Sequence, residues 1–113
     1  MYPEIEDGNI EYKRKFSKDI IDSLRMETLI TQMKWRIKEG SGLAYYYLGV
    51  NDNGSIYSMN RQEVKDTIYI FKLLVDKANV KILEISRHNI SKKEFYFKIT
   101  IQNIYEMNND NFF

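Results

Sequence analysis

Apolar residues recur at three- and four-residue steps in two stretches of the chain, which is the spacing of an amphipathic helix. The stripe in the first stretch consists of Met26, Leu29, Ile30, Met33 and Ile37. It predicts a helix that begins near Asp22 or Ser23 and ends at Gly40, which we expect to form a left-handed cap. The alternative is a longer helix capped by Ser17, because apolar residues at positions 20, 21 and 24 could extend the stripe.

The stripe in the second stretch consists of Val64, Ile68, Phe71, Val75 and Ala78. It predicts a helix from Gln62 to about Asn79, with Asn60 as its N-cap. The run Asn51-Asp52-Asn53-Gly54 lies between the two helical stretches and contains residues that tolerate positive φ, so it is predicted to be a hairpin turn.

Residue patterns typical of β-strands predict strands at 10–16, 43–50, 55–59, 80–85 and 94–101. The first has Ile10, Tyr12 and Phe16 on its expected buried face and Glu11, Lys13 and Lys15 on the other. Arg14 interrupts this pattern, so we expect the strand near a sheet edge. The second strand is apolar or aromatic on both faces, which is typical of the middle of a sheet. Its two faces are Ala44, Tyr46, Leu48 and Val50, and Leu43, Tyr45 and Tyr47.

The predicted order, β-α-β-β-α-β-β, indicates an α+β two-layer sandwich with two helices on one face of a mostly antiparallel sheet. The length of 113 residues fits a single domain, 1–113. We expect residues 1–8 and 105–113 to be flexible ends. Residues 87–93 are expected to link the last two strands.

Composition excludes several classes of function. The 17 Lys and Arg residues against 16 Asp and Glu leave a net charge of +1, so no global field attracts nucleic acid or anionic lipid. Cysteine is absent, which excludes disulfides, thiol catalysis and Cys-based zinc sites. The acidic start has no secretion signal, and no apolar run approaches the ~20 residues of a membrane span. We expect a cytoplasmic protein that does not enter a membrane.

No catalytic, cofactor or metal site is predicted. The chain has no G-x-x-x-x-G-K-[ST] loop for nucleotide phosphates. Gly40-Ser41-Gly42 lies after a helix rather than before one, so it is interpreted as a cap and turn. His88 is the only histidine and is expected on a surface linker. Asp52 and its Asn neighbours lack the alternating ligands of a calcium loop. We therefore expect a protein that is not an enzyme.

A short basic run and several sheet tyrosines are the features that favour nucleic acid. Lys13, Lys15, Tyr45 and Tyr47 are the candidate RNA contacts, because cations bind phosphates and aromatic rings stack on bases. Alternation along the first strand disperses the basic charge over two faces, and basic runs are usually solvated surface.

Two stretches resemble a known family. The first is Gly8-Asn9-Ile10-Glu11-Tyr12-Lys13, and the second runs from Leu29-Ile30-Thr31-Gln32-Met33-Lys34-Trp35-Arg36-Ile37 to Glu39-Gly40-Ser41-Gly42-Leu43-Ala44. They resemble the N-terminal region of the GTP-binding protein 1 class of elongation-factor-like GTPases, most specifically in Thr-Gln-Met-Lys-Trp-Arg. The likeness continues through Gly49-Val50 and the turn at 52–54, and then as a pattern of helix and strands to residue 101.

The resemblance implies a function without supplying catalytic residues. In that family the segment precedes a GTPase domain similar to elongation factor Tu, and the family is associated with aminoacyl-tRNA delivery, ribosomes and RNA turnover. A non-catalytic interaction or regulatory module that acts in cis or in trans is therefore implied, with a GTPase domain or another translation component as partner. The alternative is an independent RNA- or ribosome-binding domain. The tail 108–113 resembles the linker before the GTPase domain, so a truncated gene, a fragment and a separate polypeptide all remain open.

Helix geometry identifies the candidate partner-binding residues. With ~100° between successive residues, Trp35 falls nearly opposite the apolar stripe, on the side that carries Thr28, Thr31 and Gln32. A large aromatic among small and polar residues is typical of an interface anchor. The alternative is that the N-terminal segment near Tyr2, or the C-terminal tail, covers the ring.

Overall fold

The computed structural model describes residues 1–104. Both helices begin directly after a residue whose side chain caps the first turn. In α1 (Leu24–Glu39), Ser23 Oγ accepts a hydrogen bond from the Met26 amide at 3.3 Å. In α2 (Arg61–Lys77), Asn60 and Glu63 form a reciprocal capping box with distances of 2.8 and 2.9 Å. Both predicted helices are confirmed. Ser17 does not extend α1; it precedes a separate 3-10 turn, η1 (Lys18–Ile20).

The end of α1 differs from the prediction in one residue. Gly40 has φ −98°, and the left-handed residue is Ser41, with φ 53°. The amides of Ser41 and Gly42 donate to the carbonyls of Lys38 and Ile37 at 3.1 and 2.8 Å, which is the Schellman pattern. Glycine is needed at position 40 for space, because a Cβ there would lie 1.8 Å from the Leu43 carbonyl oxygen.

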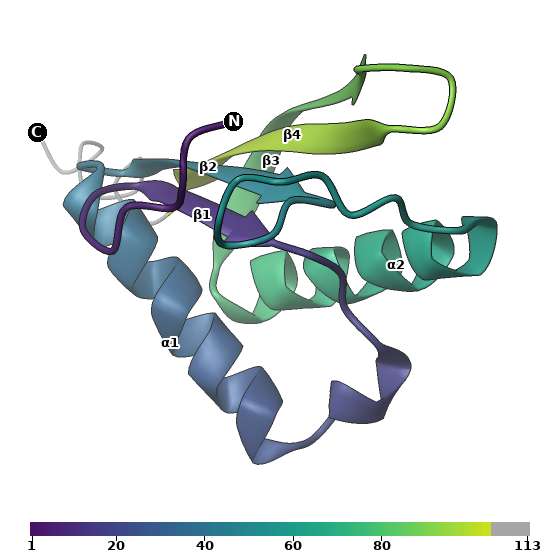
Figure 1. Ribbon diagram of the computed structural model, residues 1–113. Coiled ribbons are helices and arrows are strands. Elements are labelled where there is room, and N and C mark those ends of the chain that lie inside the picture. Colours follow the sequence, from purple (N-terminus) through teal and green to yellow (C-terminus); the bar gives the residue numbers. More distant parts are fainter. Residues whose placement is uncertain (105–113) are drawn as a thin grey trace, which may run out of the picture.

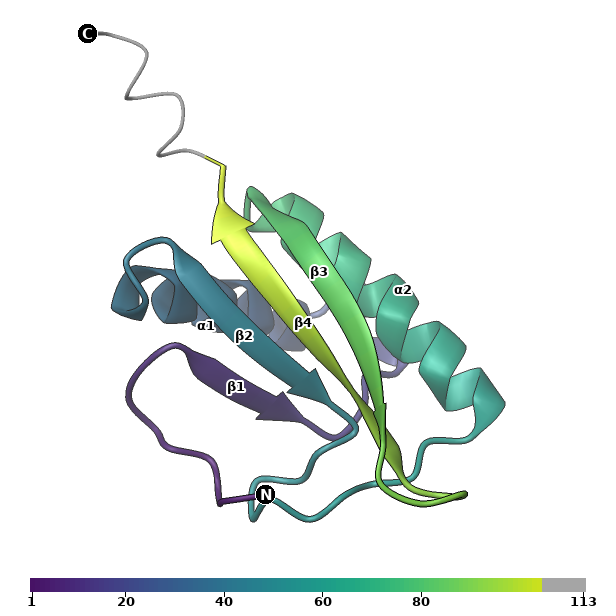
Figure 2. The same cartoon turned by 90° about the horizontal axis from the view of Figure 1, so that it is seen from above.

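The sheet contains β1 (Ile10–Lys13), β2 (Leu43–Leu48), β3 (Val80–Asn89) and β4 (Phe95–Asn103) in the order β1-β2-β4-β3. Only β1 and β2 pair in parallel, so the sheet is mostly antiparallel (Figure 2). Both helices lie on one face (Figure 1). The α+β two-layer sandwich is confirmed, as is the central position of β2.

The predicted strand at 55–59 is represented by one isolated antiparallel bridge, between Val50 and Ile56. The turn that precedes it is a tight one, since the Gly54 amide donates to the Asn51 carbonyl at 2.8 Å and Gly54 has φ 90°. The turn prediction is confirmed, although this segment does not join the sheet.

The core lies between the sheet and the two helices. On β2 and β4 the residues that face the helices are almost fully buried, namely Ala44, Tyr46, Leu48, Ile99 and Ile101. Tyr46 meets Phe71 of α2 edge to face, with ring centroids 5.2 Å apart. On α2 the buried residues also include Thr67, Ile70 and Leu74, so its buried face is centred to one side of the predicted stripe.

β1 turns the opposite face to the helices from the one that alternation predicted. Glu11 aligns with Tyr46 and faces the core, where it is 1% exposed, whereas Ile10 and Tyr12 align with Tyr45 and Tyr47 on the other side. An ion pair with Arg36 of α1 compensates the buried carboxylate. Arg14 follows this edge strand and is exposed, as expected.

The last two strands are longer than predicted. β3 extends to Asn89, so His88 lies in a strand and not in a linker, and only Ile90 to Glu94 connect β3 to β4. Within residues 1–104, neither helix is long and apolar enough to cross a bilayer.

Candidate partner-binding site

Four candidate residues share one side of α1. Thr28, Thr31, Gln32 and Trp35 follow the three- and four-residue steps that bring helical side chains together. Thr28 and Thr31 are exposed, Gln32 is half-buried, and Trp35 is 38% exposed. The structure thus brings the predicted residues together, with the indole ring partly covered and partly open to solvent.

Arg36 lies beside the Trp35 ring and is held from several directions. Its guanidinium carbon lies 4.9 Å from the centroid of the ring. Its Nε donates to Glu11 Oε1 at 2.8 Å, and its terminal nitrogens donate to the carbonyls of Gly8 and Ile5 at 2.8 and 3.3 Å. With Arg36 only 2% exposed, these contacts fix the cation next to Trp35.

The N-terminal segment, predicted as a flexible end, makes specific contacts with this region. The Glu4 amide donates to the Asp52 carbonyl at 2.7 Å, and the Tyr12 amide donates to Glu4 Oε2 at 2.5 Å. Burial, followed by a hydrogen bond with Glu11, raises the pKa of the Glu4 carboxyl to about 7. The residues from Glu4 to Gly8 therefore lie against β1 and α1 through the Glu11–Arg36 pair. The second predicted flexible end, 105–113, lies outside the described residues.

The Glu11–Arg36 pair was not predicted from the sequence, and only Arg36 carries a signal. Arg36 lies three residues after Met33 of the buried stripe, whereas Glu11 alternates with Ile10 and Tyr12 and was expected on the polar face of its strand. A charge beside the buried stripe of a helix indicates a buried partner, because an uncompensated buried charge is costly.

The candidate RNA contacts are divided between the two faces of the sheet. Tyr45 and Tyr47 lie on the face away from the helices, where Lys98 Nζ is 5.2 and 5.9 Å from their ring centroids. Lys13 lies on the helix side and pairs with Glu11 at 3.5 Å. Lys15 pairs with Glu63 at 2.8 Å.

Aromatic rings cross the face of the sheet away from the helices from one edge strand to the other, and the ring at the β1 edge, Tyr12, is buried. Tyr12 and Tyr47 have ring centroids 5.6 Å apart, and Tyr47 and Tyr96 have centroids 5.9 Å apart. His88 then stacks on Tyr96 at 4.9 Å with an angle of 5° between the planes. The sequence identified the tyrosines, but it missed His88 because β3 was predicted to end too early.

Among residues 1–104, no group of three or more His, Cys, Asp and Glu side chains could hold a metal ion. Asp52 lies in the hairpin turn, and Gly40-Ser41-Gly42 forms the end of α1, as predicted.

Comparisons with known proteins find relatives that are much longer than this chain. No family model matches. GTP-binding protein 2 from Mus musculus and from Homo sapiens are each 38% identical over 88 residues, which is 78% of this chain and 14% of the relative. An uncharacterized protein, R625, from Acanthamoeba polyphaga mimivirus is 34% identical over 89 residues, or 78% of this chain and 47% of that protein. The chain is therefore similar, over most of its length, to a small part of GTP-binding protein 2 and to about half of R625.

Proposed function

We propose that this chain is a non-catalytic interaction or regulatory module that works with a translation-type GTPase, in cis or in trans. The observation that carries the proposal is that this chain is similar to a segment that makes up 14% of the length of GTP-binding protein 2, while the chain itself contains no phosphate-binding loop. The resemblance to the N-terminal region of the GTP-binding protein 1 class supports the same role. We place this role in the cytoplasm. Nucleotide binding and hydrolysis are then tasks of the partner.

The proposed docking surface is the side of α1 that carries Trp35. Exposed tryptophans are uncommon on single domains and are enriched at the energetic centres of interfaces. Thr28 and Thr31 are small enough to let a partner approach the ring closely, and Gln32 offers an amide for hydrogen bonds. The occupant that we propose is the GTPase domain.

The surroundings of Trp35 support a preorganised anchor. Arg36 lies 4.9 Å from the ring and is itself fixed by Glu11 at 2.8 Å. A side chain that is already ordered loses less conformational entropy on binding. The N-terminal segment leaves part of the ring uncovered, since Tyr2 is 88% exposed and Trp35 is 38% exposed.

Calorimetry with GTP and GDP tests the non-catalytic assignment. We expect no heat of binding from this chain with either nucleotide, and clear micromolar binding would contradict the proposal. Thermal shift with the same nucleotides provides an independent reading, because a ligand that binds only the folded state raises Tm.

The alternative, RNA binding through Lys13, Lys15, Tyr45 and Tyr47, is not adopted on those residues. Both lysines already pair with carboxylates, at 3.5 and 2.8 Å, so a phosphate would have to displace Glu11 or Glu63. The tyrosines remain on the open face without these two cations.

A further inference from the structure

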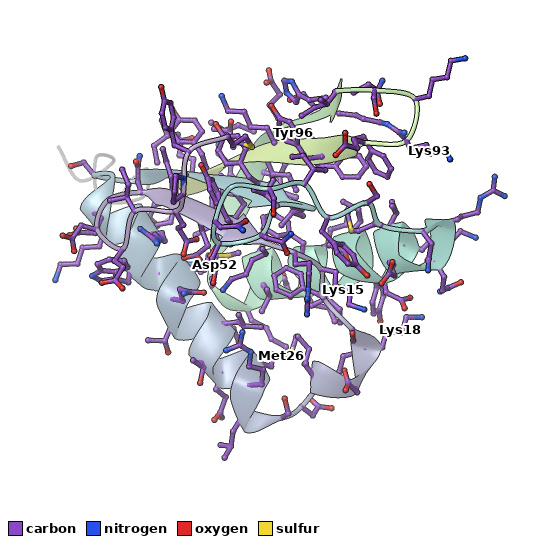
Figure 3. All side chains as sticks on the ribbon, in the orientation of Figure 1. Lys15, Lys18, Met26, Asp52, Lys93 and Tyr96 are labelled. Atoms are coloured by element: carbon purple, nitrogen blue, oxygen red, sulfur yellow. The ribbon has the colours of Figure 1, made fainter. Side chains whose placement is uncertain are left out.

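The far ends of β3 and β4 form a two-stranded arm that extends past the rest of the sheet. The last residue of β2, Leu48, pairs with Phe97, whereas β3 and β4 continue to pair as far as Asn89 and Phe95. Figure 1 shows that the arm extends away from the helices, and Figure 3 shows Lys93 at its far end. We define the arm as residues 85–98, which includes its base, where Phe97 and Lys98 still pair with β2.

Positive charge gathers on this arm although the whole chain is nearly neutral. The arm contains the four cations Arg87, Lys92, Lys93 and Lys98 and the single acid Glu94, a net charge of 4 − 1 = +3 against +1 for the chain. Within residues 1–104, none of these cations forms an ion pair. In contrast, three cations of the basic run near β1, Lys13, Lys15 and Lys18, each pair with a carboxylate, at 3.5, 2.8 and 3.7 Å.

Planar groups are stacked on both faces of the same arm. On the helix side, the Arg87 guanidinium lies 4.0 Å from the centroid of the Phe95 ring. On the open side, His88 and Tyr96 stack at 4.9 Å with nearly parallel planes, and Figure 3 places Tyr96 on this side. Arg87 is exposed and His88 is half-buried, so each stack is partly open to solvent, where a further flat ring can stack.

A groove between the arm and the first turns of α2 adds two more cations. It has a volume of about 520 Å³ and is lined by Met59, Phe95 and the side chains of Arg61, Lys65 and Arg87. No acidic residue lines it, and none of the three cations forms an ion pair among the described residues. An apolar floor with cations around it suits a ligand that combines a flat ring with negative charge.

We propose that the arm and its groove bind single-stranded RNA. Cations without carboxylate partners attract phosphates, and stacked planar groups accept unpaired bases, which is how proteins bind single strands without reading their sequence. RNA is favoured as the ligand because its loops and ends present unstacked bases. This site is separate from the Trp35 surface, so it does not depend on docking to a GTPase.

Fluorescence anisotropy with the full chain and a labelled 12-nucleotide single-stranded RNA tests the proposal. The double variant K92A/K93A should weaken binding at least about fivefold and reduce the salt slope by about 1.4, the value for two lost phosphate contacts. R87K keeps the charge but loses the planar stack, so it should weaken binding about fivefold or more with an unchanged salt slope. The matched control is K34A/K72A, which removes two exposed helix lysines and should change affinity less than twofold.

Three results would overturn the proposal. The first is no measurable binding of the RNA at low salt, and the second is an equal loss of affinity in K92A/K93A and in K34A/K72A, which would indicate attraction to charge alone. The third is competition by polyglutamate as effective as competition by unlabelled RNA at equal charge, which would identify an acidic protein surface as the ligand. Circular dichroism of each variant checks that the substitutions, all at exposed positions, leave the fold intact.

Discussion

Replacing Arg36 with Ala should remove a large part of the stability of this domain. Arg36 and Glu11 are 2% and 1% exposed, and their side chains meet at 2.8 Å. Removing one partner of a buried pair usually costs ~3–5 kcal/mol, because the other charge stays buried without compensation. Lys13 lies 3.5 Å from the second oxygen of Glu11 and compensates part of its charge, so we expect the lower end of that range. Because a domain of this size loses roughly 4–8 °C of Tm per kcal/mol, Tm should fall by about 12 °C or more.

Urea unfolding followed by circular dichroism measures this loss. The double variant E11L/R36M is the matched test, because apolar residues of similar size can replace a buried pair with little net cost. We expect R36A to lose about 3 kcal/mol and the double variant to recover at least half of that loss. A loss below about 1 kcal/mol in R36A, or a double variant less stable than R36A, would refute the argument from burial.

Two further predictions concern pH. An acid whose pKa is raised on folding favours the protonated folded state. Glu4, with a pKa raised from 4.5 to about 7, should therefore make stability fall as pH rises from 4.5 to 7 and stay level above that. E4Q should flatten this part of the Tm profile, and an unchanged profile would contradict the burial of Glu4. Hydrogen bonds from Lys15 and Tyr57 lower the pKa of Glu63 from 4.5 to about 2, so its contribution should be lost as pH falls through this range. E63Q keeps the capping hydrogen bonds but should lose this acid dependence, and a Tm profile from pH 2 to 5 shows whether it does.

The parts of the fold that depend on neighbouring residues could be predicted from the sequence. The caps Ser23 and Asn60, the turn before Gly54 and the two helices follow from residues within one or two turns of each position. The two faces of β2 were also predicted, because successive side chains of a strand point to opposite faces and this strand is apolar or aromatic throughout.

The parts that were wrong depend on residues distant in the sequence. The orientation of β1 is decided by Arg36, 25 positions after Glu11, since the buried pair places a charge where alternation predicts an apolar residue. The extra length of β3 comes from its pairing with β4. This pairing continues past the end of β2, and the apolar pattern of neither strand alone indicates it.

The same distinction applies to the candidate sites. Helix periodicity alone placed Trp35, Thr28, Thr31 and Gln32 on one side of α1. Whether each cation forms an ion pair, in contrast, depends on whether the fold brings a carboxylate close to it. Lys15 is neutralised by Glu63, 48 positions away, whereas Lys92 and Lys93 at the end of the arm have no ion-pair partner among residues 1–104.

Binding of the chain to a GTPase domain, with and without Trp35, tests the central claim most directly. The titration uses an elongation-factor-like GTPase from the same genome that aligns with GTP-binding protein 2, and isothermal calorimetry reports the affinity. The matched control is Y69A, which removes a 50% exposed aromatic from α2. We predict that W35A abolishes binding and costs less than about 2 kcal/mol of folding stability, since the ring is partly exposed, while Y69A binds normally. Binding by W35A equal to that of the unchanged chain would contradict the proposed docking. A loss of stability of about 3 kcal/mol or more in W35A would show that Trp35 is structural and would contradict it as well.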